Sequence, residues 1–405
     1  MKDVFIISTG QIVKGRTAGS QRVINIAKSL AEGNINVFLC SLSRVNRNPV
    51  DSIELLPGVH FLQSRTGKVN GFLPLLGSLG SVNSFIKGRN SQPVIYLYPT
   101  AYILKDFIYL LYFKMLRRYK FFGDINELRV TNAFISDPPV NIFFKLYYYL
   151  KFIYYYIPFK LSEFQVPFYD GIVVISSNLE RYFLKYTHKI LKVPILCDVS
   201  KIPDKMPAIH YDGSTFKICF AGFINCNKEG FDTLFEALHE VNLKKDVELY
   251  LYGILIEKDR NTLNQLTERF KLRNKVFYMG NIDPDDLTRE FSSYNLLILP
   301  RPLTPQTKYG FSTKLSEYLI SGVPVLITDV SDNAIFIKDN FNGYIVTPGS
   351  SPGMANKILE IIDSYNKSSE KIAENACQTA RDKFDYKLYT KSFTDFFFNS
   401  SPKND

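Results

Sequence analysis

The chain contains no tryptophan and has only four histidines and five cysteines among its 405 residues. The histidines are scattered, so the sequence predicts neither a metal cluster nor a histidine-based catalytic triad. The cysteines are odd in number and far apart, which argues against a disulfide framework and against a zinc site. A reducing compartment is therefore expected, with no metal site.

Long apolar runs are also absent. No uncharged apolar stretch reaches about 18 residues, so no membrane span is expected. The apolar run at residues 4–7 stops at Ser8 and is too short for a signal peptide, whereas it suits a buried strand. We therefore expect a cytoplasmic protein.

Acidic residues are outnumbered by basic ones, and the net charge is +10. Such a balance favours an anionic partner, which could be a nucleic acid, an acidic membrane surface or a phosphorylated substrate. No nucleic-acid-binding signature or polybasic tail stands out, so a nucleic-acid partner is not predicted.

Apolar strand-like runs alternate with helical patterns, which predicts an α/β fold with parallel sheets. Weak periodicity and several prolines at 187–215 indicate a linker. We expect a first domain at 1–200, with a C-terminal helix in 385–405 packing back on it, and a second domain at 201–384. The expected strands are 4–8, 36–41, 93–98, 171–176, 216–221, 247–252, 276–279, 296–299, 324–328 and 343–346. The expected helices are 20–31, 178–186, 230–241, 258–270, 285–293, 313–320, 352–364 and 386–398.

Residues 101–169 combine aromatic runs with interspersed lysines and arginines. Basic residues beside tyrosines suit the headgroup boundary of an anionic membrane. The alternative is a set of buried helices whose tyrosine hydroxyls reach water. The sequence leaves both interpretations open.

The most informative segment runs from the end of a strand at Leu299 to a helix that begins after Ser312, a favourable N-cap residue. Lys314 and Glu317 are three positions apart, which places them on one helical face near the N-terminus. A lysine there can neutralise a diphosphate, and a carboxylate one turn further can accept hydrogen bonds from a ribose. A surface pair of opposite charges is the alternative.

Residues 296–348, which contain GFSTKLSEYLISGVPV, resemble the donor-binding core of GT4-type (group 1) glycosyltransferases of GT-B fold. The resemblance implies two Rossmann-like domains facing each other across a cleft. It further implies a retaining, metal-independent transfer of a sugar from a UDP- or GDP-sugar to a glycan or lipid-linked acceptor. Cell-surface polysaccharide synthesis, with peripheral contact at the inner face of the plasma membrane, is the expected setting.

The resemblance also carries over individual residues. Glu317 matches the family's ribose carboxylate, and Lys228 matches the lysine that neutralises the leaving diphosphate. Phe223 stands where the family has an arginine, a loss for which Lys314 and Arg301 could compensate. Tyr309 stands where the family often has a glutamate that holds the donor sugar, so the identity of that sugar stays open.

The full prediction follows from these matches. Glu127 is the candidate for acceptor-side chemistry. The predicted catalytic residues are Lys228, Lys314 and Glu127, and the predicted donor-binding residues are Gly222, Gly253, Asn281, Ile282, Arg301, Gly310, Phe311, Ser312, Thr313, Lys314 and Glu317.

Alternative functions remain at this stage. Residues 10–17 nearly form a phosphate-binding loop, but Arg16 replaces its lysine. Asp283 and Asp285 form a D-x-D that is better explained as acidic capping around Pro284. A nucleotide-sugar epimerase of the same fold, or a catalytically weak donor-binding subunit of a glycan-assembly complex, would share the donor segment.

Overall fold

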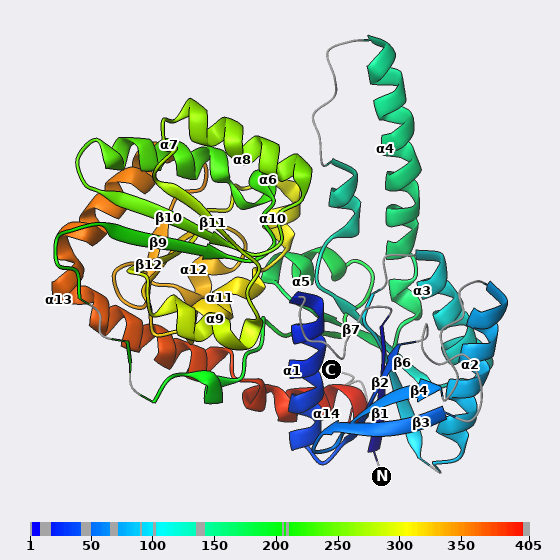
Figure 1. Ribbon diagram of the computed structural model, residues 1–405. Helices are drawn as coiled ribbons and strands as arrows, with labels where there is room; N and C mark the ends of the chain where they lie inside the picture. The colour runs from blue at the N-terminus through cyan, green and yellow to red at the C-terminus, as the bar shows by residue number, and fades with distance from the viewer. Residues whose placement is uncertain are drawn as a thin grey trace. The chain divides into compact units, whose positions relative to one another are not determined.

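The computed structural model describes residues 2–8, 18–41, 50–64, 72–89, 91–99, 103–134, 142–204, 206–207 and 210–399 (Figure 1). The chain divides into two compact units, one formed by 1–196 with 386–405 and the other by 197–385. Each unit is a sheet with helices, and the expected α/β class with two Rossmann-like units is confirmed. The near-match to a phosphate-binding loop at 10–17 lies outside the described residues.

The sheet of the first unit has the strand order β3-β4-β2-β1-β5-β6-β7-β8. All neighbouring pairs are parallel except β3 with β4. The strands are β1 (Lys2–Ser8), β2 (Asn36–Ser41), β3 (Val50–Leu56), β4 (Val59–Ser64), β5 (Gln92–Leu97), β6 (Lys120–Ile125), β7 (Gly171–Val174) and β8 (Ile190–Lys192).

The central strand β1 is apolar on both faces because helices cover both sides of this sheet. Val4 and Ile6 pack with α1 and α14, whereas Phe5 and Ile7 pack with α2 and η2. The helical segments of this unit are α1 (Ala18–Glu32), α2 (Phe72–Lys87), α3 (Ile103–Tyr109), η2 (Leu110–Leu116), η3 (Arg129–Phe134), α4 (Ile142–Glu163), η4 (Val166–Phe168), α5 (Ser177–Phe183), η6 (Tyr386–Tyr389) and α14 (Thr390–Phe398).

A buried ion pair ties the first unit together. Arg22 of α1 donates from Nη2 to Asp124 Oδ2 at the end of β6, at 3.0 Å, and Tyr96 of β5 donates its hydroxyl to the same oxygen at 2.5 Å. Arg22 Nη1 also donates to the carbonyl oxygen of Pro194, at 3.0 Å. The charged groups are thus fully engaged in an otherwise apolar interior, as burial requires.

The second unit is built on a six-stranded parallel sheet with the order β11-β10-β9-β12-β13-β14. Its strands are β9 (Phe216–Ala221), β10 (Val247–Tyr252), β11 (Val276–Gly280), β12 (Leu296–Leu299), β13 (Val325–Thr328) and β14 (Tyr344–Val346). Its helices are α6 (Cys226–Glu229), α7 (Phe231–Asn242), α8 (Glu257–Arg269), α9 (Pro284–Phe291), α10 (Pro305–Tyr309), α11 (Thr313–Leu319), α12 (Asn333–Phe336) and α13 (Ser351–Lys383).

Three expectations about the elements are corrected. The segment 187–215 is not entirely a linker, because β8 within it is the edge strand of the first sheet. The helix expected at 352–364 continues to Lys383. The second half is hard to predict from the sequence, because its buried residues include small ones such as Ala373, Ala376 and Ala380, which give a weak periodic signal. Strands β3, β4 and β6 and helices α2, α6 and α10 were missed, because these segments are short, polar on one face or low in periodicity.

Two glycines at the ends of β9 and β10 allow an unusually close backbone approach. Gly253 has φ +125°, and a Cβ atom there would lie 1.9 Å from the carbonyl oxygen of Gly222. The main chain of Gly253 donates to the carbonyl oxygen of Gly280 at 2.7 Å, which joins the ends of β10 and β11 beyond a register shift at Leu251/Tyr252. Only glycine fits at this position.

We predict that Gly253→Ala destabilises the protein by about 3 kcal/mol or more, since it combines an unfavourable φ with a backbone clash. Gly349→Ala is the matched control, because Gly349 has φ +75° but open space around it. That control is expected to cost about 1 kcal/mol. Urea unfolding followed by circular dichroism measures both, and equal losses would contradict the close-approach argument.

Candidate functional site

The strand order of the second sheet reverses between β9 and β12. In open parallel sheets, ligands bind at such a point, outside the carboxyl ends of the strands. The segments that follow these two strands contain Gly222 and Arg301, respectively. The topology therefore makes this place a candidate ligand site, and Gly222 and Arg301 of the predicted donor site lie beside it.

The short helix α6 lies beside the switch point, and the residues at its two ends, Asn225 and Gly230, fix its position. Asn225 caps it by accepting the backbone N–H of Lys228 at 2.9 Å, and Gly230 ends it with a left-handed φ of 75°. A Cβ atom on Gly230 would lie 2.2 Å from the carbonyl oxygen of Pro300, so α6 packs directly against the segment after β12. This contact brings the last residue of α6, Glu229, to the switch point.

Glu229 is the centre of a buried three-residue ion cluster. Arg301 donates from Nε and Nη2 to the two carboxylate oxygens of Glu229, each at 3.0 Å. Lys314 Nζ donates to Glu229 Oε1 at 2.9 Å. The side chains of Glu229, Lys314 and Arg301 are only 3%, 9% and 14% exposed. Bidentate and charge-assisted bonds of this kind fix the positions of both cations.

The electrostatics of the cluster leave a positive surplus. Burial alone would raise the pKa of Glu229, but Arg301 and Lys314 outweigh it and lower this pKa to about 2. Burial lowers the pKa of Lys314, opposed by Glu229 and reinforced by Arg301 and Lys228. One carboxylate thus faces two buried cations, so an anion added here would relieve the excess positive charge.

Lys314 is also positioned by packing. Its Nζ lies 4.9 Å from the ring centroid of Phe220 on β9. A Cβ atom on Gly222, which has φ +144°, would lie 2.0 Å from Lys314 Cε, so the lysine stem crosses directly over this glycine. The interpretation of Lys314 and Glu317 as a surface ion pair is therefore wrong for Lys314, which is buried and bonded to Glu229.

The loop between β12 and α11 contains features that the sequence analysis did not anticipate. Residues Pro305–Tyr309 form α10, capped by reciprocal bonds between Thr304 and Thr307, and Gly310 follows in an extended conformation. Phe311 packs its ring against Phe336 and Phe384, with centroids at 5.4 and 6.3 Å. Its side chain is thus committed to the core, and only its backbone is available to a ligand.

Ser312 occupies the N-cap position of α11, as expected, but its side chain makes no capping hydrogen bond. Its hydroxyl is buried and has no hydrogen-bond partner among the residues that the structure describes. A buried hydroxyl without a partner costs free energy, so such a group in a native protein calls for an explanation. A ligand oxygen in the candidate site would supply the missing partner.

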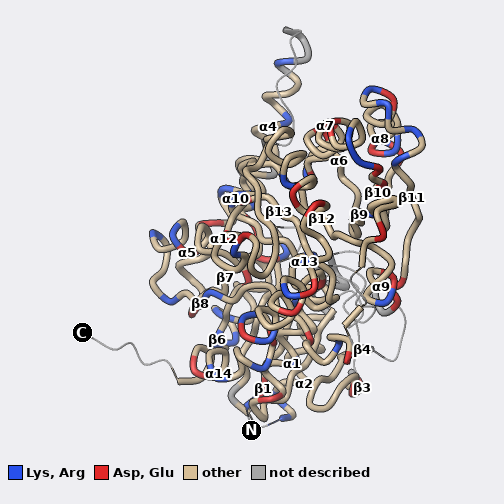
Figure 2. Tube along the Cα trace, turned by 90° about the vertical axis from the view of Figure 1, so that its left-hand side faces the viewer, with Lys and Arg blue, Asp and Glu red and all other residues tan. Residues whose placement is uncertain are grey.

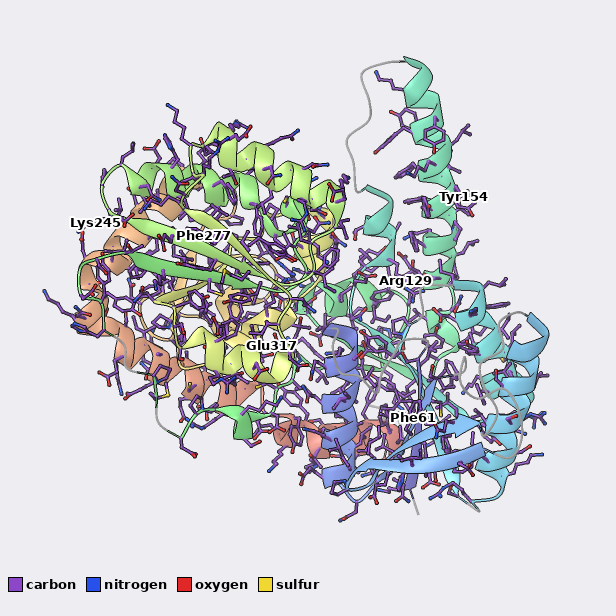
Figure 3. The ribbon with its side chains drawn as sticks, in the orientation of Figure 1. Phe61, Arg129, Tyr154, Lys245, Phe277 and Glu317 are labelled. Atoms are coloured by element: carbon purple, nitrogen blue, oxygen red, sulfur yellow. The ribbon has the colours of Figure 1, made fainter. Side chains whose placement is uncertain are left out.

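The remaining predicted donor residues lie on the same unit. Glu317, labelled in Figure 3, is half-buried on α11, and burial raises its pKa against the effect of Lys314 and Lys201. Lys228 is half-buried at the end of α6 and close enough to influence Lys314. Asn281 and Ile282 directly follow β11, whose last residue Gly280 bonds to Gly253.

Glu127 belongs to the first unit. It lines a pocket at the end of β6, together with Asn126 and Arg129. Within the described parts of both units, no group of three or more His, Cys, Asp or Glu side chains is placed to hold a metal ion. The expected metal independence stays a prediction.

Comparison with known proteins supports the family resemblance. Residues 205–379 match the family model for glycosyl transferases group 1. The match lies within the second unit, 197–385. The resemblance predicted from residues 296–348 is confirmed at this level, and the GT4 subdivision stays a prediction.

Individual proteins are more distant. A sucrose synthase of Melioribacter roseus is 28% identical over 134 residues, which make up 32% of this chain and only 17% of that protein. The sucrose-phosphate synthase of Thermosynechococcus elongatus has a TM-score of 0.70 at 16% identity, covering 98% of this chain and 99% of the other. Alr3699/HepE of Anabaena, solved with UDP and glucose, has a TM-score of 0.66 at 15% identity, covering 99% and 100%. At these identities the solved structures establish the GT-B fold alone.

Sequence reasoning missed the residue on which the cluster depends. Glu229 stands next to Lys228 at a helix end, and nothing local distinguishes it from a solvated carboxylate. The Asn225 cap and Gly230 are recognisable helix-end signals, and they could have indicated that α6 is a separate turn. The two cations that bond to Glu229, Arg301 and Lys314, are 72 and 85 residues away from it in the chain.

We predict that Glu229→Gln lowers the free energy of unfolding by about 3 kcal/mol at pH 7, because two buried cations lose their counter-charge. The folded-state pKa of Glu229 is depressed from 4.5 to about 2, so its stabilising effect is complete above pH 4.5 and is lost as the pH falls towards 2. The difference between wild type and variant should therefore shrink across this window. Denaturant unfolding between pH 7 and 3 measures it.

The control for this experiment is Glu240→Gln, which removes an exposed carboxylate from α7. That variant should stay within about 0.5 kcal/mol of wild type at every pH. A pH-independent gap for Glu229→Gln would contradict the assignment of Glu229 as an ionised partner of Arg301 and Lys314.

Proposed function

We propose that this chain is a retaining glycosyltransferase that moves a sugar from a UDP- or GDP-sugar to a glycan or lipid-linked acceptor. The observation that carries the proposal is the pair of buried cations, Arg301 and Lys314, held by one carboxylate at the switch point of the second sheet. A nucleotide diphosphate matches this surplus positive charge. The crystallised complex of Alr3699/HepE with UDP and glucose supports a donor of this class for the shared fold.

Each donor group has a proposed partner. Lys314, Arg301 and Lys228 face the diphosphate, and the Ser312 hydroxyl donates to one of its oxygens. The backbone around Gly222, Gly310, Phe311 and Thr313 lies beside the donor, and the Lys314 stem crosses Gly222 to reach it. Glu317 accepts from the ribose hydroxyls. Gly253, Asn281 and Ile282 line the place of the nucleobase at the ends of β10 and β11.

The chemistry follows from where charge develops. When the bond between the anomeric carbon and the diphosphate breaks, negative charge accumulates on the leaving oxygens. Fixed cations aimed at those oxygens stabilise the transition state and need no reorganisation during the reaction. Because lysine and arginine can supply this charge, we propose a reaction without a bound metal, in which the acceptor attacks from the leaving-group face with Glu127 on the acceptor side.

The first test measures nucleotide release from UDP- and GDP-sugars with an acceptor glycan extract. Lys314→Ala is expected to lower kcat/KM by about 100-fold or more, the effect typical of losing one transition-state donor. Lys308→Ala is the matched control, since it removes an exposed lysine from α10, six residues away, and should change kcat/KM less than about twofold. EDTA is expected to leave the rate unchanged.

The same assay separates the alternatives. A changed sugar isomer formed without acceptor would identify a nucleotide-sugar epimerase. Tight donor binding by calorimetry without turnover would identify a donor-binding subunit, consistent with Tyr309 and Phe223 at positions where the family has charged residues. If no UDP- or GDP-sugar binds at all, the proposed function is wrong.

We also propose that the protein works in the cytoplasm at the inner face of the plasma membrane, in cell-surface polysaccharide synthesis. None of the helices described is long and apolar enough to cross a bilayer. The support comes instead from exposed apolar stripes. Leu104, Phe107, Leu111 and Met115 lie along α3 and η2 at helical spacing, and each is 39% to 68% exposed. Exposed apolar surface of this extent is typical of an interaction site.

Helix α4 extends this surface. It rises beyond the sheet of its own unit (Figure 1), and Tyr147, Leu150, Tyr154 and Ile157 on it are 50% to 72% exposed. Lys145, Lys151 and Lys160 are spread along it, whereas its one acidic residue, Glu163, is its last (Figure 2). Tyrosines beside lysines suit the interface of an anionic bilayer. The alternative of fully buried helices is wrong for α4.

Because the chain has no tryptophan, one introduced tryptophan can report on membrane contact. Tyr154→Trp places it at the most exposed tyrosine of α4, which points away from the helix (Figure 3). With anionic vesicles containing brominated lipid at low salt, we expect a blue shift and at least twofold quenching. Leu243→Trp on the second unit, 67% exposed in the native residue, is the control and should show neither. Equal quenching of both, or of neither, would contradict the proposal.

A further inference from the structure

A row of exposed apolar side chains runs along helix α4 at alternating spacings of three and four residues. Six side chains follow this spacing, and each is 50% to 72% exposed: Tyr147, Leu150, Tyr154, Ile157, Leu161 and Phe164. The first five lie on α4 itself, and Phe164 directly follows its last residue. We call these six side chains the α4 seam.

The spacing of the α4 seam is the heptad period of helices that pack against another helix. In heptad notation the a positions are 147, 154 and 161, and the d positions are 150, 157 and 164. A helix that only lies in a bilayer needs no such regularity, because lipid chains adapt to a broader apolar face. A narrow stripe of a and d positions is instead the pattern of a coiled-coil contact. The spacing therefore favours a second helix as the partner of this face.

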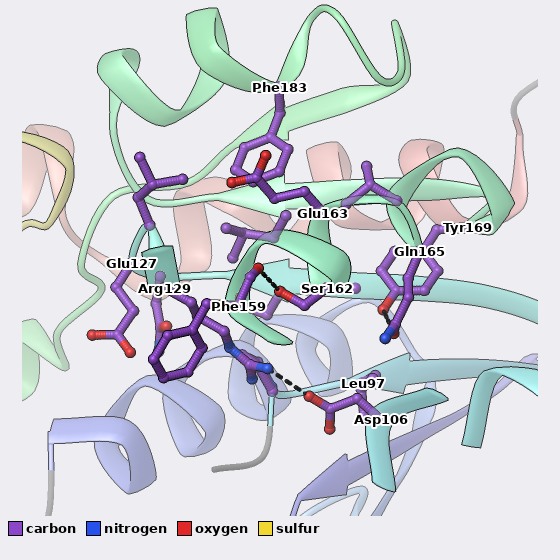
Figure 4. A pocket seen from close by; sticks show the side chains of 17 residues that line it. Leu97, Asp106, Glu127, Arg129, Phe159, Ser162, Glu163, Gln165, Tyr169 and Phe183 are labelled. Atoms are coloured by element: carbon purple, nitrogen blue, oxygen red, sulfur yellow. Dashed lines mark hydrogen bonds and ion pairs between the residues drawn. The ribbon is translucent and has the colours of Figure 1, made fainter. Parts of the chain in front are cut away.

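The opposite face of α4 packs against its own unit. Phe159 and Glu163, about half a turn around the helix from the seam, line a pocket in the first unit (Figure 4). Glu163 is 4% exposed and accepts from the hydroxyls of Tyr182 and Tyr186, at 2.9 and 2.6 Å. The C-terminal half of α4 is thus anchored on one face, which leaves the seam on the outer face of a single copy.

A second copy of α4 complements the seam when the two helices run antiparallel. A two-fold axis between positions 155 and 156 brings each a residue opposite a d residue of the other copy. The facing pairs, one residue from each copy, are then Tyr154 with Ile157, Leu150 with Leu161, and Tyr147 with Phe164. Since only the C-terminal half of α4 is anchored, this direction also keeps the bodies of the two copies at opposite ends of the helix pair.

The lysines beside the seam do not oppose each other in this arrangement. Lys151 occupies an e position and Lys160 a g position, and in antiparallel pairs e faces e and g faces g. Lys151 then lies opposite Pro158 of the other copy, and Lys160 lies opposite Ile153. Lys160 is moreover bonded to Glu163 of its own helix, at 2.5 Å. No like charges meet across the pair.

We infer that two copies of this chain pair antiparallel through the α4 seam when no membrane is present. Each copy then shields apolar side chains that would otherwise face water. The bilayer contact proposed above uses the same side chains, so pairing and membrane contact exclude each other, and a bilayer releases single copies. The release rests on the proposed membrane contact, whereas the pairing does not.

Sedimentation velocity of the full chain in lipid-free buffer tests the pairing. We expect a monomer–dimer equilibrium, and Leu150→Ser should raise its dissociation constant about tenfold or more, since the change removes two apolar contacts from each dimer. Tyr149→Ser is the matched control, because Tyr149 is 52% exposed at a c position outside the seam. It should leave the dissociation constant within about twofold of wild type. Thermal unfolding excludes a loss of fold as the cause.

Introduced cysteines test the direction of the pair, because all five native cysteines are buried. The antiparallel arrangement places position 150 of one copy opposite position 161 of the other. A mixture of Leu150→Cys and Leu161→Cys should therefore form a mixed disulfide about tenfold faster than either variant forms one with itself, since pairing raises the effective thiol concentration. Cross-linking of Leu150→Cys to itself at an equal rate would show a parallel pair and overturn the inferred arrangement.

Further outcomes decide the remaining points. A wild-type chain that stays monomeric at every concentration would reject the inference, as would a dimer that Leu150→Ser leaves intact. Anionic vesicles should lower the yield of the mixed disulfide, and an undiminished yield on vesicle-bound protein would reject the release. A monomeric wild-type chain that binds a UDP- or GDP-sugar would leave the proposed function intact, whereas a dimer that binds no such donor would reject the proposed function alone.

Discussion

One carboxylate organises the candidate donor site. Glu229 holds Arg301 and Lys314 in a dry environment where neither cation would otherwise be stable, and both are thereby fixed before any ligand arrives. Since one negative charge cannot balance two positive ones, the cluster keeps an affinity for anions. The same bonds therefore stabilise the fold and preorganise the site, and the cost of burying Lys314 is offset in part by Glu229 and in part, we propose, by the donor.

This arrangement depends on backbone contacts that only glycine permits. Gly222 lets the stem of Lys314 cross the end of β9, and Gly230 lets α6 pack against the carbonyl oxygen of Pro300. Side chains at either position would separate Glu229 from its partners. The sheet order matters equally, because β9 and β12 are neighbours in space although 74 residues separate the end of the first from the start of the second. Small residues and topology together create the site.

In the first unit the buried charges are paired with each other, and apolar side chains are exposed on one helix. Its charged groups inside the sheet, Arg22 and Asp124, are fully paired and serve cohesion. Tyr147, Leu150, Tyr154 and Ile157 on its helix α4 are exposed. A helix that is apolar around most of its circumference is normally buried, so its exposure indicates a surface that another component covers.

The sequence by itself determined the α/β class, all six strands of the second sheet and four of the eight described in the first, because apolar periodicity and helix caps are local signals. The Lys314–Glu317 spacing is also local, and it predicted the donor segment. The sequence also pointed to Arg301 and Lys228 as additional cations. Only the tertiary structure revealed Glu229 as the shared partner of Arg301 and Lys314, the Ser312 hydroxyl that has no partner among the described residues, the core position of Phe311 and the exposure of α4. Each of these depends on which distant segments meet, and chain-local patterns carry no information about that.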